Sequence, residues 1–283
     1  MAALQIDRGM NGFLKIATDA AGISRVCGPS VAARWLGQIV VNFPDVLKSK
    51  NLQPADRAMG SGPFEATRAR SRALLTGTQV FSNLREIWVR DVYLKNDFLA
   101  VPKNALVVDL GANLGVFSAL ALAQDESVRV IAVEASLALL ESLKRCIAAN
   151  GWSARLMPIR GFIGTFTETQ KAALKQGPDY ADAPIITEAE LISQSGMSKI
   201  DLLKCDIEGS EFFLLEPESR LLAMTDRLAI ELHKWGGDIG GFLSHLSRIG
   251  FQIGHVEWAH GSCVALCRRK VPVSQMRGVA ASN

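Results

Sequence analysis

The sequence predicts an α/β protein with a doubly wound, mostly parallel sheet and a mainly helical N-terminal extension. Three observations lead to this prediction. From Leu106 onward, short apolar runs alternate with stretches of helical periodicity, as in repeated strand–helix units. The last two apolar runs are joined only by Trp258–Ser262, which is too short for a parallel crossover, so they form an antiparallel hairpin. The first hundred residues differ, because they carry apolar residues at helical spacing.

Taken in order, the apolar runs predict a Rossmann-like sheet of seven strands whose last strand is antiparallel. The expected strands are Leu106–Leu110, Val128–Val133, Arg155–Ile159, Ile200–Asp206, Leu228–Leu232, Phe251–Glu257 and Cys263–Arg268. The expected helices between them are Val116–Ala123, Leu137–Ala149, Glu211–Ala223 and Phe242–Ile249. Open sheets of this kind bind ligands at the carboxyl ends of their parallel strands, so polar residues at those ends are the candidates for a site.

The N-terminal extension is expected over residues 1–82, the sheet domain over 83–270 and a flexible tail over 271–283. An apolar stripe predicts a helix that packs against the main domain, which is favoured over a helix lying on a membrane surface. The stripe consists of Val31, Trp35, Leu36, Ile39, Val40 and Phe43. Gln53–Pro63 is rich in Pro, Gly and Ser and is predicted to be a loop. A basic cluster, either solvated or facing an acidic substrate, consists of Arg57, Arg68, Arg70 and Arg72.

Composition and charge argue against several classes of protein. With 283 residues, of which 48% are hydrophobic and 21% charged, the chain is an ordinary globular one. Its net charge of +3 is far below the basic excess of a nucleic-acid binder. No signal peptide or membrane span is expected. Five cysteines without a C-x-x-C pair predict free thiols in a reducing cytoplasm. No common zinc site has the spacing of His255, His260, Cys263 and Cys267.

A glycine turn follows the first expected strand of the sheet. The run Val107–Gly115 ends a strand and begins a helix, and Gly111 and Gly115 allow the backbone to approach a ligand closely. The spacing is G-x-x-x-G with Asn113 between, whereas nicotinamide-binding proteins usually carry G-x-G-x-x-G. Asp109 before the turn would repel a pyrophosphate but can accept a hydrogen bond from an ammonium group. The turn therefore favours S-adenosylmethionine, which has such a group and no phosphate, over an ordinary structural turn.

Glu134 ends the second expected strand, 25 residues after Asp109. A carboxylate at this place can accept hydrogen bonds from both hydroxyl groups of a ribose. Because dinucleotide-binding proteins share this feature, it supports a nucleoside-containing ligand without identifying it. The alternative is a glutamate that caps the helix beginning near Ser136.

Charged residues gather at the ends of the fourth and fifth strands. The strand period places Lys204, Asp206 and Glu208 on one face, and Glu231 and His233 share a face of the next strand. A histidine can titrate near neutral pH and take a proton from a hydroxyl group. The alternatives are acids that favour a helix dipole and a structural histidine.

These motifs resemble those of the FkbM-type methyltransferases. The matching segments are VVDLGANLGVFS at 107–118, VEAS at 133–136, KIDLLKCDIEGSE at 199–211, ELH at 231–233 and REIWVRDVY at 85–93. The resemblance covers roughly Phe64 to Lys270. It implies the seven-stranded methyltransferase sheet, S-adenosylmethionine as the methyl donor, and O-methylation of a hydroxyl group on a natural product or glycan.

Carried over by position, the resemblance assigns roles to individual residues. The residues that would hold the cofactor are Asp109, Gly111, Asn113 and Glu134, and Gly115 of the glycine turn is counted with them as a candidate cofactor-binding residue. Those that would lie near the reaction centre are Asp206, Glu208 and Glu211. The chain departs from the family pattern at Ile186–Leu191, where a Leu-Asp pair is common, and Thr165–Asp182 looks like a variable loop. The identity of the acceptor is therefore left open.

The sequence thus predicts an S-adenosylmethionine-dependent methyltransferase whose first candidate base is His233, followed by Asp206 and Glu208, with Glu231 beside them. No metal ligand is assigned, although Asp206, Glu208, Glu231 and His233 could instead hold a divalent cation. The expected partner is a small-molecule or glycan acceptor, with no nucleic acid, and the extension is expected to serve acceptor binding or self-association into a homo-oligomer. The alternatives are a nicotinamide-dependent oxidoreductase and a non-catalytic cofactor-binding protein.

Overall fold

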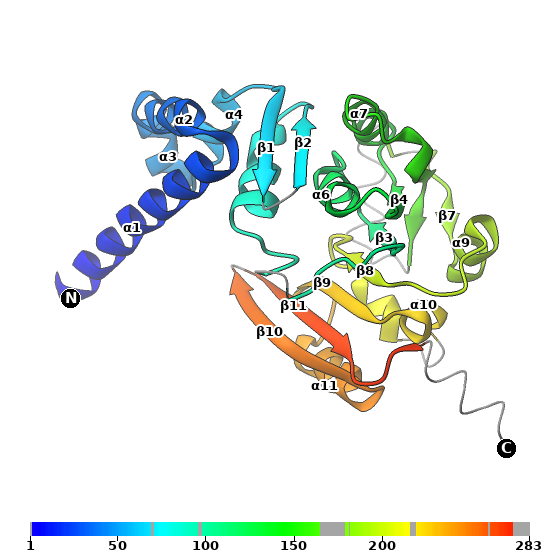
Figure 1. The fold of residues 1–283 in the computed structure, drawn as a ribbon. Helices are drawn as coiled ribbons and strands as arrows, with labels where there is room; N and C mark the ends of the chain where they lie inside the picture. The colour runs from blue at the N-terminus through cyan, green and yellow to red at the C-terminus, as the bar shows by residue number, and fades with distance from the viewer. Residues whose placement is uncertain are drawn as a thin grey trace, which may run out of the picture. The chain divides into compact units, whose positions relative to one another are not determined.

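The computed structural model describes residues 2–68, 71–95, 98–164, 179–180, 182–215, 219–259 and 261–273, with the backbone alone for residues 2–11 and 259. The chain divides into two compact units, Met1–Asp91 and Val92–Asn283 (Figure 1). Arg70, His260, most of Thr165–Asp182 and most of the expected C-terminal tail lie outside the described residues. The separate roles expected for the extension and the sheet domain remain predictions.

The first unit is mainly helical, as the sequence predicted. Its elements are α1 (Ala2–Cys27), α2 (Pro29–Val41), α3 (Phe43–Ser49), α4 (Gln53–Ala58), the hairpin of β1 (Phe64–Arg68) and β2 (Ser71–Leu75), α5 (Val80–Leu84) and a π-helical turn η1 (Arg85–Val89). Gly28, with a φ of 92°, separates α1 from α2, and Pro29 occupies the first turn of α2, where no backbone N–H is needed.

One expectation about the first unit needs correction, and the packing of the apolar stripe against the sheet domain stays a prediction. The buried part of the stripe, Trp35 and Ile39, belongs to α2, which contacts α1 and α4 of the same unit. Val40 and Phe43 are 75% and 52% exposed. The segment expected to be a loop begins with α4, because Pro54 fits the first turn of a helix and only the residues after Met59 are irregular.

A buried ionic network holds the helices of the first unit together. The guanidinium of Arg85 lies 2.8 Å from Asp19 Oδ2 and 2.6 Å from Asp56 Oδ2. Trp35 Nε1 donates to Asp56 Oδ1 at 2.8 Å, and Arg90 Nη2 reaches Asp19 Oδ2 at 2.5 Å. Because Arg85, Asp19 and Asp56 are all buried, their charges are compensated by one another and little by water.

The second unit contains the predicted seven-stranded sheet. Its strands are β3 (Leu106–Leu110), β4 (Arg129–Glu134), β5 (Leu156–Arg160), β8 (Leu202–Cys205), β9 (Arg227–His233), β10 (Phe251–Ala259) and β11 (Ser262–Arg269). Their order is β10-β11-β9-β8-β3-β4-β5. The last strand, β11, is antiparallel to both of its neighbours, β9 and β10, and Figure 1 shows it beside β10. The Rossmann-like architecture is thereby confirmed.

Helices pack on both faces of this sheet. They are α6 (Val116–Gln124), α7 (Leu137–Ala148), α9 (Glu188–Ser195), α10 (Arg220–Met224) and α11 (Ile239–Arg248), with the 3-10 turns η2 (Ser153–Arg155) and η3 (Glu211–Leu215) and a small parallel pair of β6 (Phe162–Ile163) and β7 (Ile185–Ile186). Val108 and Leu110 of β3 belong to the core that Leu191, Leu221 and Phe242 complete. Asp109 between them faces Ser118 of α6 on the opposite side.

One predicted helix of the sheet domain is wrong. Glu211–Ala223 was expected to be continuous, but the structure has the turn η3 and then α10. Pro217 lies between them in the sequence, and proline removes a backbone donor and disfavours a helical residue before it. No helix among the described residues combines the length and the apolar character needed to cross a membrane.

Candidate active site

The glycine turn after β3 lies against the end of β8. Gly111, Asn113 and Gly115 all have positive φ angles, of 73°, 50° and 77°. A Cβ on Gly111 would lie 1.8 Å from the carbonyl oxygen of Asp206, so only glycine fits there. Gly115 packs against Leu143 of α7, which a Cβ would approach to 2.7 Å. Gly111 therefore allows the end of β3 to contact the end of β8, and Gly115 allows the following helix, α6, to pack closely against α7.

Asp109 lies beneath this turn and does not line the cavity. It is fully buried, its Oδ2 accepts a hydrogen bond of 2.7 Å from Ser118 Oγ, and its Oδ1 lies 3.3 Å from Lys204 Nζ. Lys204, its register partner on β8, also donates to the carbonyl of Gly111 at 2.7 Å. Burial would lower the pKa of Lys204, but the charges of Asp109 and Asp206 outweigh it and raise that pKa. Asp109 and Lys204 thus support the turn from below as an ion pair.

Glu134, at the end of β4, does line the cavity. Its Oε2 accepts a hydrogen bond from the backbone N–H of Asn113, and its Oε1 accepts one from that of Ser136, each 2.8 Å long. Burial raises the pKa of Glu134 even though these two hydrogen bonds act in the opposite direction. Each oxygen keeps a second lone pair for a ligand. The helix α7 is capped separately by Ser136 Oγ, which accepts from Leu139 N.

The cavity has a volume of about 360 Å³, which is in the range of small-molecule and cofactor sites. Its polar wall comes from the ends of β3, β4 and β8. Its apolar wall was not foreseen from the sequence and consists of Val133, Leu139, Phe162, Ile163, Tyr180 and Ile207. Tyr180 falls in the expected variable loop, and Phe162 belongs to the two-residue strand β6, which is too short for a periodic signal.

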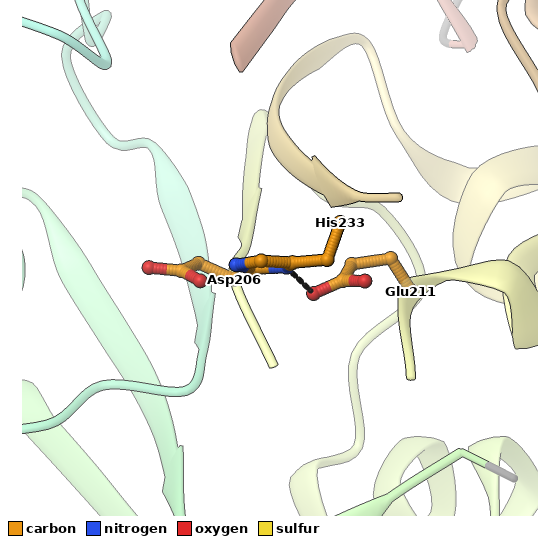
Figure 2. Close-up of side chains that lie close together, drawn as sticks. All are labelled: Asp206, Glu211 and His233. Atoms are coloured by element: carbon orange, nitrogen blue, oxygen red, sulfur yellow. Dashed lines mark hydrogen bonds and ion pairs between the residues drawn. The ribbon is translucent and has the colours of Figure 1, made fainter. Parts of the chain in front are cut away.

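Beyond the cavity, His233 at the end of β9 is held by Glu211 at the start of η3. His233 Nδ1 lies 2.9 Å from Glu211 Oε1, and both side chains are buried. The same oxygen accepts hydrogen bonds of 3.0 Å from the backbone N–H groups of Ile207 and Gly209. Figure 2 shows the histidine ring between Asp206 and Glu211. Glu211 thereby fixes both the ring and the turn that follows β8.

Two further carboxylates lie near the other ring nitrogen, and Asp206 lies close by. His233 Nε2 lies 3.6 Å from Glu208 Oε2 and 3.9 Å from Glu231 Oε1. Donor atoms of Asp206, Glu211 and His233 all lie within 4.8 Å of one another. The hydroxyl of Tyr93 donates to Asp206 Oδ2 at 3.0 Å and lies 3.4 Å from Glu231 Oε2. We call Asp206, Glu208, Glu211, Glu231 and His233 the rim cluster.

The rim cluster carries excess negative charge. Burial would lower the pKa of His233, but the hydrogen bond and charge of Glu211 and the charges of Asp206 and Glu208 raise it to about 9. Burial, reinforced by the charge of Asp206, raises the pKa values of Glu208 and Glu231. A histidine with this pKa carries a proton near neutral pH, so the expectation that His233 titrates near neutrality needs correction.

The structure brings most of the predicted site residues together. Gly111, Asn113 and Glu134 line one end of the cavity, and Asp206 and Glu208 connect it to Glu231 and His233 in the rim cluster. Asp109 and Gly115 lie outside the cavity lining.

Sequence reasoning missed two aromatic side chains at the rim. Tyr93 follows η1 in the sequence but contacts Asp206 more than a hundred residues later. Trp235 is 57% exposed and its ring lies 4.4 Å from that of His233. Tyr93 is the last residue of the segment at 85–93 that resembles the FkbM-type methyltransferases, and this resemblance was the one feature of the sequence that could have indicated its role.

This strand order, with a glycine turn after the first strand of the sheet and a carboxylate at the end of the second, defines the class of Rossmann-like methyltransferases. A family model described as the methyltransferase FkbM domain matches residues 109–253, which is more than half of the chain. The chain belongs to the FkbM methyltransferase family, whose methyl donor is S-adenosylmethionine. No curated protein matches the sequence.

Several solved structures are similar at low identity. The precorrin-6Y C5,15-methyltransferase of Geobacter metallireducens is 11% identical over 65% of this chain and 88% of its own, with a TM-score of 0.42. TrmK of M. capricolum, in complex with S-adenosylhomocysteine, is 10% identical over 62% and 67%, with a TM-score of 0.41. The mitomycin 7-O-methyltransferase MmcR is 14% identical over 65% and 56%, with a TM-score of 0.37. Similarity at this level says nothing about the acceptor.

Proposed function

We propose that the chain transfers the methyl group of S-adenosylmethionine to a hydroxyl group of a small natural product or a glycan. The observation that carries the proposal is the continuity of the cavity with the rim cluster. Asp206 and Glu208 line the cavity, while Glu231 and His233 lie next to them on β9. A donor held in the cavity would thus face side chains that bind hydroxyl groups.

The cavity residues fit the donor. The free lone pairs of Glu134 suit the two hydroxyl groups of a ribose, and the apolar wall around Phe162 and Leu139 suits a flat purine ring. The close contact of Gly111 with the backbone of Asp206 leaves the turn without side-chain bulk. We assign Asp109 and Lys204 a structural role, in which their ion pair supports this turn. When bound, the donor supplies an electrophilic methyl group on a sulfonium sulfur.

The rim cluster is assigned to the acceptor. A hydroxyl group can donate a hydrogen bond to Asp206 or Glu208, which aligns its oxygen with the donor's methyl group. As the new C–O bond forms and the C–S bond breaks, the hydroxyl proton passes to one of these carboxylates. Asp206 and Glu208 are preferred as bases over His233 because they line the cavity and His233 does not.

Trp235 supports a glycan among the candidate acceptors. Its large ring is 57% exposed beside His233, and its Nε1 donates to the carbonyl of Glu208 at 3.4 Å. An exposed aromatic face next to several carboxylates offers an apolar surface for the C–H face of a sugar and acceptors for its hydroxyl groups. We also place the reaction in the cytoplasm, where five free thiols stay reduced.

Two experiments test the proposed function. In the first, thermal unfolding is followed with S-adenosylhomocysteine and with NADH, and only the former is expected to raise the melting temperature. A shift with NADH alone would favour the oxidoreductase. In the second, isotopically labelled S-adenosylmethionine is incubated with a panel of glycosides and phenolic natural products, and products are identified by mass spectrometry. Label on nitrogen or carbon, and never on oxygen, would contradict the proposal.

A variant links the rim cluster to turnover. His233→Asn removes the anchor on Glu211, so the rim carboxylates lose their alignment, and turnover on the acceptor found above is expected to fall on the order of 10²-fold. The affinity for S-adenosylhomocysteine should stay the same, because the polar groups assigned to the donor are on β3 and β4. His255→Asn, on β10, is the matched control. Normal turnover in His233→Asn would remove His233 from the active site.

A further inference from the structure

The hydroxyl of Tyr93 contacts two carboxylates of the rim cluster. Tyr93 is 4% exposed, and its hydroxyl donates a hydrogen bond of 3.0 Å to Asp206 Oδ2. The same hydroxyl lies 3.4 Å from Glu231 Oε2. A phenol has one proton to donate, so the shorter distance identifies Asp206 as its main partner. Tyr93 thus connects the end of β8 with β9.

The contacts of Asp206 leave one of its oxygens for a ligand. Tyr93 donates to Oδ2, and Lys204 Nζ lies 3.9 Å from the same atom. Among the described residues, no group forms a hydrogen bond with Oδ1. Asp206 also lines the cavity. A carboxylate that is held through one oxygen presents the other at a fixed place, which is what the alignment of an acceptor hydroxyl requires.

The ring of Tyr93 is itself held in place. It meets the ring of Phe117 on α6 edge to face, with the ring centroids 5.6 Å apart. Lys204 Nζ lies 5.5 Å from the centre of the Tyr93 ring, which is a cation–π contact. Lys204 is fixed in turn by Asp109 and by the carbonyl of Gly111. The position of the phenol therefore depends on the same ion pair that supports the glycine turn.

The segment that begins with Tyr93 crosses three strands of the sheet. In the register of the sheet, Glu231 of β9, Val264 of β11 and Glu257 of β10 lie opposite one another. Tyr93 contacts the first of these residues, and Lys95 forms an ion pair with the last. Residues that are two positions apart in the chain thus bind side chains that are two strands apart.

Phe98 anchors the same segment on β10. A Cβ on Gly254 would lie 1.8 Å from the ζ carbon of Phe98, so the aromatic ring packs directly on the backbone of that glycine. Gly254 lies where the register between β10 and β11 shifts. The guanidinium carbon of Arg268 lies 4.3 Å from the centroid of the Phe98 ring. These contacts hold the chain that follows Tyr93 against the sheet.

We propose that Tyr93 is a positioning residue for methyl transfer, whose hydroxyl holds Asp206 so that the other carboxylate oxygen binds the acceptor hydroxyl. The inference rests on the proposed function and chooses between its two candidate bases. The side chain of Asp206 is 25% exposed, whereas that of Glu208 is 80% exposed. As the C–O bond forms and the C–S bond breaks, the hydroxyl proton passes to Asp206 Oδ1, and Tyr93 keeps its own proton.

The first test is Tyr93→Phe, which removes the hydroxyl and keeps the ring that packs on Phe117. With the acceptor identified by labelling, kcat is expected to fall about 10–100-fold while the affinity for S-adenosylhomocysteine stays the same, because misalignment slows the chemical step alone. Thr225→Val is the matched control. It removes a buried hydroxyl that donates to the carbonyl of Leu221 at 2.7 Å, just before β9 begins, and should leave kcat unchanged.

A double variant distinguishes positioning of the base from a general structural role. Asp206→Asn removes the assigned base, so adding Tyr93→Phe should lower kcat little further, as for residues that act as a unit. If the two losses multiply instead, Tyr93 acts independently of Asp206 and the proposal is wrong. Normal kcat in Tyr93→Phe overturns it as well.

A measurement without turnover tests the contact itself. The chain has two tyrosines, Tyr93 and Tyr180, so carbon-13 labelling of the ring carbon that bears the hydroxyl gives two NMR signals, which Tyr93→Phe assigns. Asp206→Asn should shift the signal of Tyr93 by more than that of Tyr180. A shift at Tyr93 no larger than that at Tyr180 overturns the proposal.

A failure of the proposed function looks different. The signal of Tyr93 would then still respond to Asp206→Asn, while no variant and no wild-type chain transfers a methyl group to oxygen. That result refutes the proposed function and the role of Tyr93 in it. Conversely, transfer to oxygen that is as fast in Tyr93→Phe as in the unmodified chain refutes the role of Tyr93 and leaves the proposed function intact.

Discussion

Single residues at the ends of β3, β4 and β8 hold the two halves of the site in place. Gly111 lies against the backbone of Asp206, and Glu134 accepts the N–H groups of Asn113 and Ser136. These residues could be predicted from the sequence. A glycine or a carboxylate at the end of a strand usually either forms a turn or binds a ligand. The sequence could not show that Asp109 is paired with Lys204, since that pairing depends on the register of β3 with β8.

Glu134 is expected to contribute directly to donor binding. Glu134→Ala should weaken the affinity for S-adenosylhomocysteine by on the order of 1.5–3 kcal/mol, because a carboxylate with two free lone pairs is lost. Isothermal titration calorimetry measures this loss. Glu141→Ala, in which an exposed glutamate of α7 paired with Lys144 is removed, should bind normally. Equal affinities of the two variants would make Glu134 a structural residue.

Substitutions at Gly111 and Gly151 distinguish the cost of backbone strain from that of a steric clash. Both glycines have a φ of 73°, so the backbone strain in an alanine variant should be similar at the two positions. Nothing lies within 4 Å of a Cβ on Gly151, so Gly151→Ala should cost only about 1–2 kcal/mol of unfolding free energy. Gly111→Ala meets the carbonyl of Asp206 at 1.8 Å and should cost clearly more and also abolish binding of S-adenosylhomocysteine. Denaturant unfolding of both variants measures the difference. Similar losses would mean that the contact between the two strand ends can relax.

At the scale of elements, alternating patterns were predictable and irregular ones were not. The seven strands of the main sheet were predicted within one or two residues because each is a short apolar run with a clear end, whereas the two-residue strands β6 and β7 were missed. The segment after β8 was expected to be a helix, but its first residues turn back so that Glu211 can hold His233. This turn depends on a contact between β8 and β9 that no local pattern records. The hairpin of β1 and β2 was also missed.

The thiol of Cys267 on β11 makes the stability of the sheet depend on pH. Burial raises the pKa of Cys267 from 9.0 to about 12. Above pH 9 the unfolded chain loses this proton while the folded chain keeps it, so the stabilisation present below pH 9 is lost between pH 9 and 12, at up to about 1.4 kcal/mol per pH unit. Cys267→Ala should therefore show a shallower decline in unfolding free energy over this range. Parallel curves for the two chains would contradict the assignment.

The ionic network of the first unit should be essential to that unit. Arg85→Ala leaves Asp56 buried without a cationic partner and leaves Asp19 with Arg90 alone, and breaking a buried ion pair typically costs about 3–5 kcal/mol. Arg72→Ala removes an exposed partner of Glu65 and should change little. Thermal unfolding followed by circular dichroism compares the two. If Arg85→Ala is as stable as Arg72→Ala, the network does not hold the helices together.

At the scale of the whole molecule, every residue assigned to the donor belongs to the second unit. The family model also lies within that unit, which leaves the role of the first unit to be found by experiment. The sequence indicated a helical extension from its apolar spacing, but it could not show where the unit ends. That boundary depends on the buried partners of Arg85, which are distant in the sequence.

A truncated chain that begins at Val92 should still bind the methyl donor but should lose a function that depends on the first unit. We expect it to fold and to bind S-adenosylhomocysteine, while acceptor methylation or self-association is lost. A cut near Gly77 is less suitable, because Arg85 would remain without Asp19 and Asp56. Calorimetry and size-exclusion chromatography with light scattering compare the truncated and full chains. A folded truncation that cannot bind S-adenosylhomocysteine would show that the first unit serves the donor.

The position of β11 between β9 and β10 affects when the site can form during synthesis. The strand that carries Glu231 and His233 has one neighbour, β8, until residues 262–269 leave the ribosome and pair with its open edge. The donor cavity needs only strands made earlier. A nascent chain should therefore be able to bind the methyl donor before the rim cluster is ordered, and the proposed methyl transfer would begin only after β11 has been made and has paired with β9.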